Sequence, residues 1–290
     1  MTWIEDKRVV VTGATSGIGR AVATQLVAHG AHVVLAARDV AGAERVAAEL
    51  NVAGTGGPTS VMQLDTADAR SIRAFAREYV GTHGALDVLV NNAGVLSPDR
   101  GTSADGVELT FATNVVGYFH VTLELLDALR AARSSRVVNV ASTFAGHVDL
   151  DDVQFNRRPY DGLAAYAQSK ACDRMLTWAF ARRLAGEAVT VNAMAPGLVL
   201  DTKLYRHLPA DVTQQLASYG TRTLDDGADT AIWLAAHDDV DGVTGRFFER
   251  RTEIACEFRG EAVEDRLWTI CEQLVDRRRE PRADGTGPTR

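Results

Sequence analysis

The stretch Val9-Val10-Val11-Thr12-Gly13-Ala14-Thr15-Ser16-Gly17-Ile18-Gly19 decides how this chain folds. It begins with an apolar, β-branched run and then passes through a segment with three glycines. It continues into Ala21, Val22, Leu26 and Val27, which recur at helical spacing. The pattern predicts a strand, a glycine turn and the start of a helix.

Glycine spacing in this turn favours a phosphate ligand. At Gly13, Gly17 and Gly19 the backbone can approach a pyrophosphate closely, and a helix that starts near Gly17 adds the positive end of its dipole. The same predicted site includes Thr15, Ser16 and Ile18. A turn of this kind, taken alone, is also compatible with a simple tight connection between a strand and a helix.

A second informative stretch is Tyr166-Ala167-Gln168-Ser169-Lys170. Tyr166 and Lys170 are four residues apart in a helical pattern that runs from Ala164 to Ala181, so a phenol and an ammonium share one helix face. A neighbouring cation favours the phenolate. Such a pair is usually just a solvated face, but here Asn91-Asn92-Ala93-Gly94 and Ser142 lie between the two stretches, each after a predicted strand.

Composition limits the class of protein. With 290 residues, of which 46% are hydrophobic, the chain can form one large core, and a single domain over residues 1–279 is predicted. The net charge of −7 comes from scattered acids and bases, which argues against a nucleic-acid partner. The three cysteines form no CxxC or CxxH cluster, so neither a disulfide framework nor a structural metal is expected.

Strand-like and helical segments alternate along the chain. The seven runs expected to form strands are 8–11, 32–35, 61–64, 86–90, 136–140, 189–193 and 245–248. They predict an α/β fold with a doubly wound, Rossmann-type parallel sheet of seven strands and helices on both faces. The carboxyl ends of parallel strands share one edge, where the glycine turn, Asn91, Ser142 and Pro196 would meet.

Other segments break this alternation. Residues 146–163 and 198–222 are candidate substrate-binding loops. Residues 261–279 have the pattern of an amphipathic helix through Val263, Leu267, Ile270 and Leu274, and residues 280–290 have the composition of a disordered tail.

The N-terminal residues lead directly into the first strand. They contain neither a basic region nor an apolar region of the kind found in secretory signals. No uninterrupted apolar run approaches the ~20 residues needed to cross a bilayer. A cytoplasmic protein without a membrane span is therefore expected.

Together these motifs resemble the short-chain dehydrogenase/reductase family over about residues 7–248. The retinol-dehydrogenase-like branch is the most similar, and light-dependent protochlorophyllide reductase is also similar. The features that favour this branch are Thr102-Ser103-Ala104-Asp105-Gly106-Val107-Glu108, which precede Asn114, and the 24-residue step from Ser142 to Tyr166. The resemblance implies a dinucleotide-dependent oxidoreductase.

Arg38 directs the choice of cofactor to NADP(H). It follows the second predicted strand, where no carboxylate is placed to accept hydrogen bonds from a ribose diol, and a guanidinium suits a 2′-phosphate. The alternative is an exposed arginine paired with Asp39.

The resemblance implies further cofactor contacts. Asp65 would bind the adenine amino group, although by itself it would be interpreted as the cap of a helix over 67–79. Asn91, Ala93 and Gly94 would lie along the adenosine ribose.

The Pro196-Gly197-Leu198-Val199 stretch resembles the family's turn beneath the nicotinamide. A threonine usually follows at the fifth position after the proline. Here Asp201 occupies that place and the threonine is Thr202.

The catalytic residues are also assigned from the residue types and the resemblance. Tyr166 would donate a proton to the reduced oxygen, with Lys170 lowering the pKa of the phenol and binding the nicotinamide ribose. Ser142 would orient the substrate oxygen, and Asn114 would hold a water in a proton relay. Taken singly, Ser142 is compatible with a strand-end turn and Asn114 with a polar break in a buried helix.

These residues predict an NADP(H)-dependent oxidoreductase that interconverts a ketone or aldehyde and an alcohol. Two alternatives stay open: a dinucleotide-binding sensor or assembly subunit without turnover, and an epimerase or dehydratase that recycles its cofactor. An apolar substrate is suggested by Phe144, Phe155, Tyr160 and Tyr205, which are also compatible with packing roles. The helix around 105–132 and the one that carries Tyr166 resemble those through which the family forms homo-oligomers.

Overall fold

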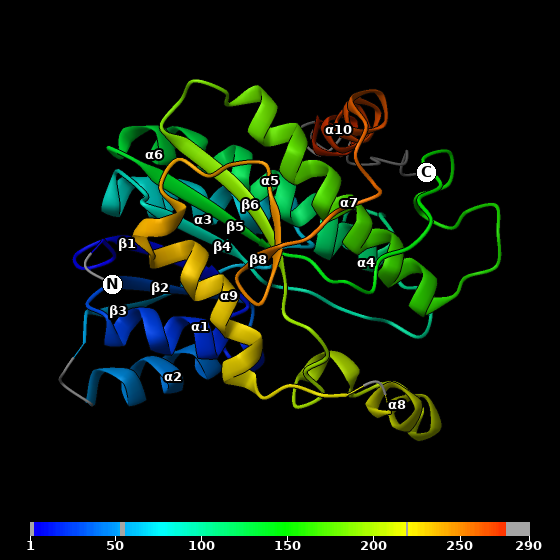
Figure 1. Ribbon diagram of the computed structural model, residues 1–290, viewed down its shortest axis with the longest axis horizontal. Coiled ribbons are helices and arrows are strands. Elements are labelled where there is room, and N and C mark those ends of the chain that lie inside the picture. The colour runs from blue at the N-terminus through cyan, green and yellow to red at the C-terminus, as the bar shows by residue number, and fades with distance from the viewer. Residues whose placement is uncertain (1–2, 53–55, 219, 277–290) are drawn as a thin grey trace, which may run out of the picture.

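The computed structural model describes residues 3–52, 56–218 and 220–276 and has a single central sheet (Figure 1). The strand order is β3-β2-β1-β4-β5-β6-β7-β8. The strands are β1 (Arg8–Thr12), β2 (His32–Ala37), β3 (Thr59–Gln63), β4 (Val88–Asn91), β5 (Ser135–Val140), β6 (Val189–Ala195), β7 (Phe247–Glu249) and β8 (Thr252–Glu253).

The predicted doubly wound sheet is confirmed, with one addition. Strands β1 to β7 are the seven predicted strands, and each pairs in parallel with its neighbours. The order reverses between β1 and β4, which creates the crevice where ligands bind in such sheets. The eighth strand, β8, pairs antiparallel with β7 and has only two residues, too few to leave a periodic pattern in the sequence.

Helices cover both faces of the sheet (Figure 1). The α-helices are α1 (Gly17–Ala28), α2 (Val40–Val52), α3 (Ala69–His83), α4 (Leu109–Phe111), α5 (Gly117–Glu124), α6 (Leu126–Ala131), α7 (Gly162–Arg183), α8 (Ala210–Ala217), α9 (Leu224–Ala236) and α10 (Glu261–Asp276). A π-helical turn, η1 (Ala112–Val116), joins α4 to α5, and the 3₁₀ turns are η2 (Lys203–Tyr205) and η3 (Asp238–Val240).

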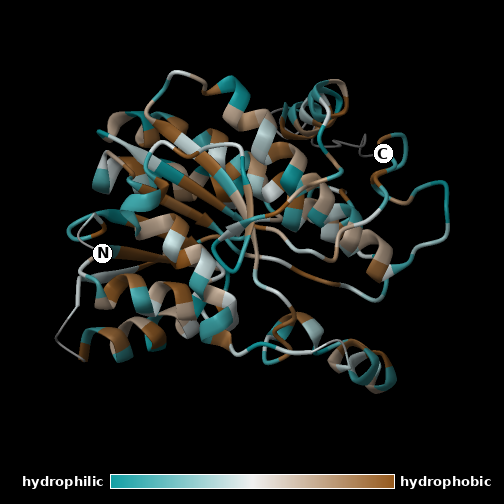
Figure 2. Ribbon diagram, viewed as in Figure 1, coloured by the Kyte–Doolittle hydropathy of each residue, from teal (hydrophilic) through white to brown (hydrophobic). Residues whose placement is uncertain are grey.

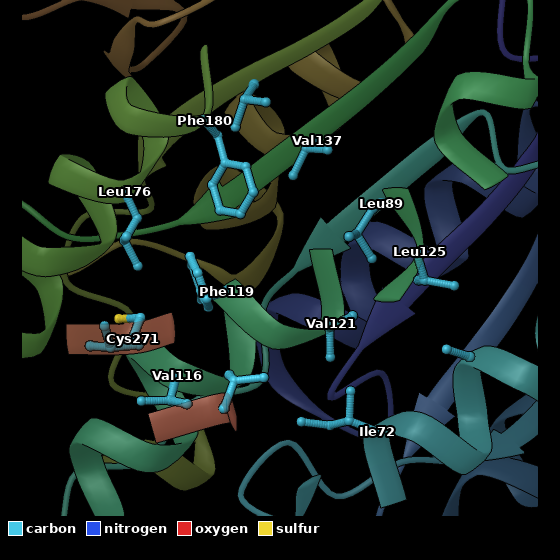
Figure 3. Close-up of a cluster of buried hydrophobic side chains, with 14 of the residues drawn as sticks. Ile72, Leu89, Val116, Phe119, Val121, Leu125, Val137, Leu176, Phe180 and Cys271 are labelled. Carbon is cyan, nitrogen blue, oxygen red and sulfur yellow. The ribbon is translucent and has the colours of Figure 1, made fainter. Parts of the chain in front are cut away.

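Alternation along the strands divides the core into two layers. Val9 and Val11 of β1 pack in the layer with α1, α2 and α9, whereas Val10 packs in the layer with α3, α5, α7 and α10. Figure 2 shows the strands as a largely apolar centre beneath helices with polar outer faces. Figure 3 shows the second layer, where Leu89 and Val137 of the sheet meet helix residues such as Phe119 and Phe180.

The predicted C-terminal helix is present as α10, but its buried face differs from the prediction. Leu267, Trp268, Cys271 and Val275 are buried, whereas Val263 is 45% exposed. The difference arises because α10 lies against α7 and η1 and is oriented by those contacts. The predicted tail over 280–290, and the predicted helical residues 277–279, lie outside the described residues.

Trp268 anchors α10 to the helices beneath it. Its ring meets Phe119 of α5 and Phe180 of α7 edge-on, with centroid distances of 4.8 Å and 4.7 Å. The part of α5 and α7 that carries these rings is therefore covered by α10. In the part of the chain that the structure describes, no helix has the length and apolar character required to cross a membrane.

Candidate active site

The glycine turn connects β1 to α1 at the crevice of the sheet. Gly13 has φ +69°, and its N–H donates to the carbonyl of Ala36 over 2.8 Å. A Cβ on Gly19 would lie 2.6 Å from the carbonyl oxygen of Gly13 and 2.3 Å from Nδ2 of Asn92. The close approach of these backbones explains why the turn contains glycines.

The first turn of α1 can receive an anion. Its N-cap residue, Ser16, makes no side-chain capping bond, and no acidic residue occupies the first turn. A Cβ on Gly17 would lie 3.3 Å from Cγ2 of Thr202, so the backbone here is open on its outer side except for that threonine. These features fit a dinucleotide pyrophosphate, with Ser16, the backbone amides of Gly17 to Gly19 and Thr202 as the residues that would hold it.

A cavity of about 620 Å³ opens beside this turn. It lies between α1, the segment 200–206 and the start of α9, and it includes the basic side chains of Arg20, Lys203 and Arg206. Tyr166 does not line it. The cavity therefore extends outward from the phosphate turn and is not the space in which the chemistry is expected.

Arg38 lies at the end of β2 with an exposed side chain. The expected alternative partner, Asp39, instead accepts a hydrogen bond from the backbone N–H of Gly42 over 2.9 Å. No ion pair to Arg38 occurs within the described ranges. The guanidinium is therefore placed at the cofactor edge of the sheet without a competing carboxylate.

Asp65 follows β3 but does not cap the next helix. Helix α3 begins at Ala69, and its cap is Asp68, whose carboxylate accepts from the N–H groups of Arg70 and Ser71. Asp65 closes a turn instead, with Oδ1 accepting from the N–H of Ala67 over 3.0 Å. The helix starts two residues later than predicted, because Asp68 supplies the cap.

The Asn91 to Gly94 segment separates into buried and accessible residues. The side chain of Asn91 points into the core, where Nδ2 donates to Thr122 (3.0 Å) and to Asn139 (2.9 Å). Ala93 and Gly94 lie at the surface of the crevice. A cofactor contact from Asn91 would have to come from its backbone.

Thr12 links this segment to the glycine turn, a role that the sequence did not reveal. Its hydroxyl accepts from the N–H groups of Asn92 (2.9 Å) and Ala93 (3.0 Å). The amide of Asn92 donates to the carbonyl of Thr12 over 2.9 Å. The ends of β1 and β4 are thus held together beside the predicted cofactor site.

Asn114 lies in the π-helical turn η1 and is fully buried. Its amide donates to the carbonyl of Val95 (3.0 Å) and to Oγ of Ser169 (2.9 Å), while its Oδ1 accepts from the N–H of Val95 (2.9 Å). π-helical turns occur frequently at functional sites. Asn114 ties the loop after β4 to helix α7 one residue before Lys170.

The structure brings Ser142, Tyr166 and Lys170 together. Ser142 follows β5 and acts on the Tyr166 phenol through a side-chain hydrogen bond. The Lys170 ammonium lies 5.8 Å from the centre of the Tyr166 ring. All three lie at the carboxyl edge of the sheet, as predicted from their positions after strands and on one helix face.

Electrostatics at Tyr166 differ from the expectation of a lowered pKa. Burial raises the pKa of the phenol, and the negative charge of Asp173 raises it further, while the hydrogen bond with Ser142 lowers it. The Lys170 ammonium donates to the carbonyl of Val140 (2.9 Å) and to Asp173 (2.8 Å). Tyr166 is therefore held as a phenol, because the nearby cation is occupied by a carboxylate.

Arg174 is a further residue that the sequence did not reveal. Its side chain is buried, and Nε donates to the backbone carbonyl of Ser142 over 3.1 Å. The guanidinium also lies 4.0 Å from the centre of the Phe247 ring. Arg174 thereby fixes the backbone that carries Ser142.

The turn after β6 has the conformation that its sequence suggests. Gly197 has φ +72°, and Arg222 crosses it closely and donates to the carbonyl of Pro196 over 3.4 Å. Val199 is buried, and its carbonyl accepts from the hydroxyl of Thr202 over 3.2 Å. Thr202 thus continues the turn and meets the glycine turn at Gly17, despite its one-residue offset.

The four candidate substrate aromatics fall into two groups. Phe155 is buried and packs against Tyr160 at 5.3 Å, and Tyr160 donates to a carboxylate oxygen of Glu108 over 3.1 Å. These two rings stabilise the 146–163 segment. Phe144, in contrast, is 49% exposed and stacks on Tyr166 with a centroid distance of 6.4 Å. Burial raises the pKa of Tyr205, and the neighbouring Tyr166 raises it further.

The 146–163 segment is anchored to α7. Gln168 of α7 donates to the carbonyl of Val153 (3.0 Å) and accepts from Arg158 (2.7 Å) and from the N–H of Asp149 (3.2 Å). The segment therefore forms a fixed wall beside the helix that carries Tyr166.

Known proteins match this chain closely. The family model for short chain dehydrogenases matches residues 7–213. Retinol dehydrogenase 14 of Mus musculus is 37% identical, covering 94% of this chain and 86% of its own length. A solved structure of an uncharacterized protein from Mycobacterium paratuberculosis has a TM-score of 0.75 at 28% identity, over 94% of each chain. An NAD(P)-dependent gluconate 5-dehydrogenase from Beutenbergia cavernae, with NADP bound at low occupancy, has a TM-score of 0.69 at 31% identity, covering 85% of this chain and 95% of its own.

Proposed function

Because this chain belongs to the short-chain dehydrogenase family, we propose that it is an NADP(H)-dependent oxidoreductase that interconverts an alcohol and a ketone or aldehyde. The observation that carries the proposal is the meeting of Ser142, Tyr166 and Lys170 at the sheet edge that also holds the glycine turn. A proton donor and a dinucleotide site at one edge are what carbonyl reduction requires.

The preference for NADP(H) is supported by Arg38. Its exposed guanidinium lies at the end of β2, and the adjacent carboxylate of Asp39 is engaged by the backbone of Gly42. A 2′-phosphate at this place would receive charge-assisted hydrogen bonds from the guanidinium. The solved relative from Beutenbergia cavernae, which binds NADP, is consistent with this choice.

Each residue of the site has a separate role in the proposed reaction. A bound nicotinamide supplies or accepts the hydride. Tyr166 donates a proton to the substrate oxygen during reduction and takes it back during oxidation. Ser142 orients that oxygen, and Lys170 supplies positive charge behind the phenol. Burial of the Tyr166 and Lys170 side chains strengthens these interactions.

An apolar substrate is supported by the rings next to Tyr166. Phe144 is half exposed beside the phenol, and Tyr205 approaches it from η2. Exposed aromatic side chains at a reaction site favour an apolar ligand surface. Retinol dehydrogenase 14 of Mus musculus carries an apolar alcohol in its name, and we extend that substrate class to this chain.

Cofactor binding and turnover test the proposal together. The purified protein is titrated with NADPH and NADH by fluorescence, and cofactor oxidation is then followed with apolar aldehydes and ketones, retinal among them. Tighter binding of NADPH with stoichiometric turnover is expected. A preference for NADH would overturn the role of Arg38. Binding without turnover on any carbonyl would instead support a sensor, and product formation without net cofactor oxidation would support an epimerase or dehydratase.

A further inference from the structure

A buried carboxylate contacts the catalytic lysine. Asp173 lies three residues after Lys170 on α7, and its Oδ2 is 2.8 Å from the lysine Nζ. The Lys170 side chain is 4% exposed and that of Asp173 is fully buried. The second carboxylate oxygen, Oδ1, has no hydrogen-bond partner among the described residues.

Burying the Asp173 carboxylate lowers the stability of the fold, which indicates that the charge is kept for a functional reason. A buried carboxylate with an unpartnered oxygen loses its hydration, and one ion pair does not fully compensate for that loss. Burial raises the pKa of Asp173 to about 6, with Lys170 and Arg174 opposing that rise. The carboxylate is therefore ionised at neutral pH, although a neutral residue would fit the same space at lower cost.

We propose that Asp173 is a positioning residue that holds the Lys170 ammonium as its counter-ion and keeps Tyr166 in the protonated, proton-donating form. The inference rests on the proposed function, because it assigns Tyr166 the transfer of the proton. It predicts that Asp173 sets the pH at which the catalytic tyrosine changes its protonation state.

Asp173 keeps Tyr166 protonated because its charge is negative. A cation near a phenol lowers its pKa, and an anion near the same cation cancels part of that effect. In the structure the negative charge of Asp173 raises the pKa of Tyr166, whereas Lys170 donates to Asp173 and to the carbonyl of Val140.

Other ionisable groups face this cluster and belong to the same electrostatic environment. They are Tyr118 on α5, Tyr205 on η2, and Arg174 and Cys172 on α7. Burial raises the pKa of both Tyr118 and Cys172, so these two are neutral near pH 7. Arg174 is directed to the carbonyl of Ser142. Asp173 is therefore the one anion identified in this surrounding, within the described part of the chain.

The first test compares the protein with Asp173→Asn over a range of pH. This variant keeps the size of the side chain and removes its charge. We expect the pH at which kcat/KM for alcohol oxidation levels off to fall by about one unit or more. The pH at which carbonyl reduction begins to decline should fall by the same amount. The measured quantity is the pH at which each profile of kcat/KM bends. The ratio of kcat/KM for oxidation to that for reduction at a single pH is not informative, because the reaction equilibrium fixes it.

A matched control lies one turn further along α7. The Thr177 hydroxyl donates to the backbone carbonyl of Asp173 (2.8 Å) and accepts from Asn139 (2.9 Å), and its side chain is fully buried. Thr177→Val disturbs the same helix without changing any charge, so its pH profile should keep its bends in place. Equal shifts in Thr177→Val and Asp173→Asn would show a general structural effect and overturn the proposal.

A second measurement needs neither cofactor nor turnover. In protein labelled with ¹³C at aspartate Cγ, the resonance that disappears in Asp173→Asn should titrate with a pKa of about 6. In Lys170→Met the same resonance should titrate at higher pH, because the cation that favours the carboxylate is lost. An Asp173 resonance whose titration is unchanged in Lys170→Met would overturn the inference.

The NMR experiment also separates the two proposals. A protein without oxidoreductase activity, in which Asp173 nevertheless titrates near neutral pH and responds to Lys170→Met, would contradict the proposed function and leave the ion pair established. Turnover with unchanged bends in Asp173→Asn would contradict only the role of Asp173. Where Asp173→Asn fails to fold, sequential assignment of the unaltered protein identifies the Asp173 carboxyl resonance, and its titration is followed there.

Discussion

The buried guanidinium of Arg174 is hydrogen-bonded to the backbone carbonyl of Ser142, with Nε and Nη2 both donating to the same oxygen. The two residues are 32 positions apart, and the contact joins the middle of α7 to the end of β5. Phe247 and Phe258 enclose the guanidinium at 4.0 Å and 5.4 Å. The backbone of Ser142, the residue proposed to orient the substrate oxygen, is thus held by a residue on the helix that also carries Tyr166, the proposed proton donor.

Replacing this guanidinium should lower turnover without removing a reacting group. In Arg174→Met, kcat should fall by about tenfold, because loss of the clamp misplaces the Ser142 hydroxyl. Steady-state kinetics measure the effect, and NADPH affinity should change little. The control is Arg246→Met, which removes an exposed arginine paired with Glu253. A turnover in Arg174→Met equal to that of the control would show that the clamp is dispensable.

Tyr166→Phe should lower kcat by about 10²–10⁴-fold, because the proton donor is removed while the ring remains. NADPH binding, measured by fluorescence, should be nearly intact. Tyr160→Phe is the matched control, since Tyr160 also loses a hydroxyl with defined partners but packs in the 146–163 segment. Undiminished turnover in Tyr166→Phe would remove this tyrosine from the mechanism.

Arg38→Asp should reverse the choice of cofactor. The new carboxylate would repel a 2′-phosphate and accept hydrogen bonds from a ribose diol. Loss of one charge-assisted contact, about 1.5–3 kcal/mol, corresponds to roughly 10–150-fold weaker NADPH binding. Arg45→Asp on α2 is the control, because it makes the same charge change at another exposed position. Equal loss in both variants would indicate a general effect of charge.

Two glycine-to-alanine changes should have opposite effects on stability. A Cβ on Gly19 would overlap the carbonyl oxygen of Gly13 and the amide of Asn92, so Gly19→Ala should lower the free energy of unfolding by about 1–3 kcal/mol and weaken NADPH binding. A Cβ on Gly81, in α3, would meet nothing within 4 Å. Gly81→Ala should raise the free energy of unfolding by about 0.5–1 kcal/mol. Urea denaturation checks both, and a stable Gly19→Ala would contradict the close approach.

Trp268→Ala should destabilise the attachment of α10. Trp268 is buried, with 8% of its surface exposed, and its ring contacts Phe119 and Phe180. Its removal should therefore lower the free energy of unfolding by about 3–5 kcal/mol. Glu272→Ala, at an exposed position of the same helix, should have little effect. The molar mass in solution, measured by light scattering, should show whether exposing this face promotes self-association. An unchanged denaturation midpoint in Trp268→Ala would show that the contact contributes little.

Much of the fold follows from local patterns. The seven predicted strands are present because β-branched runs between glycine turns and helical segments leave few other arrangements. Helix α7 was predicted from Ala164 and begins at Gly162, where Asp161 caps it. The errors also have local causes: Asp68 was overlooked as the cap of α3, and β8 is too short to show a period.

For the candidate site, the sequence predicted the helical spacing of Tyr166 and Lys170 but not the direction of the Asn91 side chain. Tyr166 and Lys170 share a face because four residues make about one helical turn, and that requires no knowledge of the rest of the fold. The direction of the Asn91 side chain could not be read from its position at the end of a strand. Thr122 and Asn139, which hold it in the core, come from different elements.

The sequence by itself determined the seven strands of the parallel sheet, the glycine turn and the spacing of the tyrosine and the lysine. Each of these depends on neighbours along the chain, through backbone conformation and the periods of helix and strand. Only the tertiary structure decided that Lys170 is paired with Asp173 in a buried site and that Arg174 holds Ser142. The strength of such contacts depends on the exclusion of water. Val140 of β5 and Tyr118 of α5 surround the Lys170 ammonium, and Phe247 and Phe258 surround the Arg174 guanidinium, so the enclosure comes from distant parts of the chain.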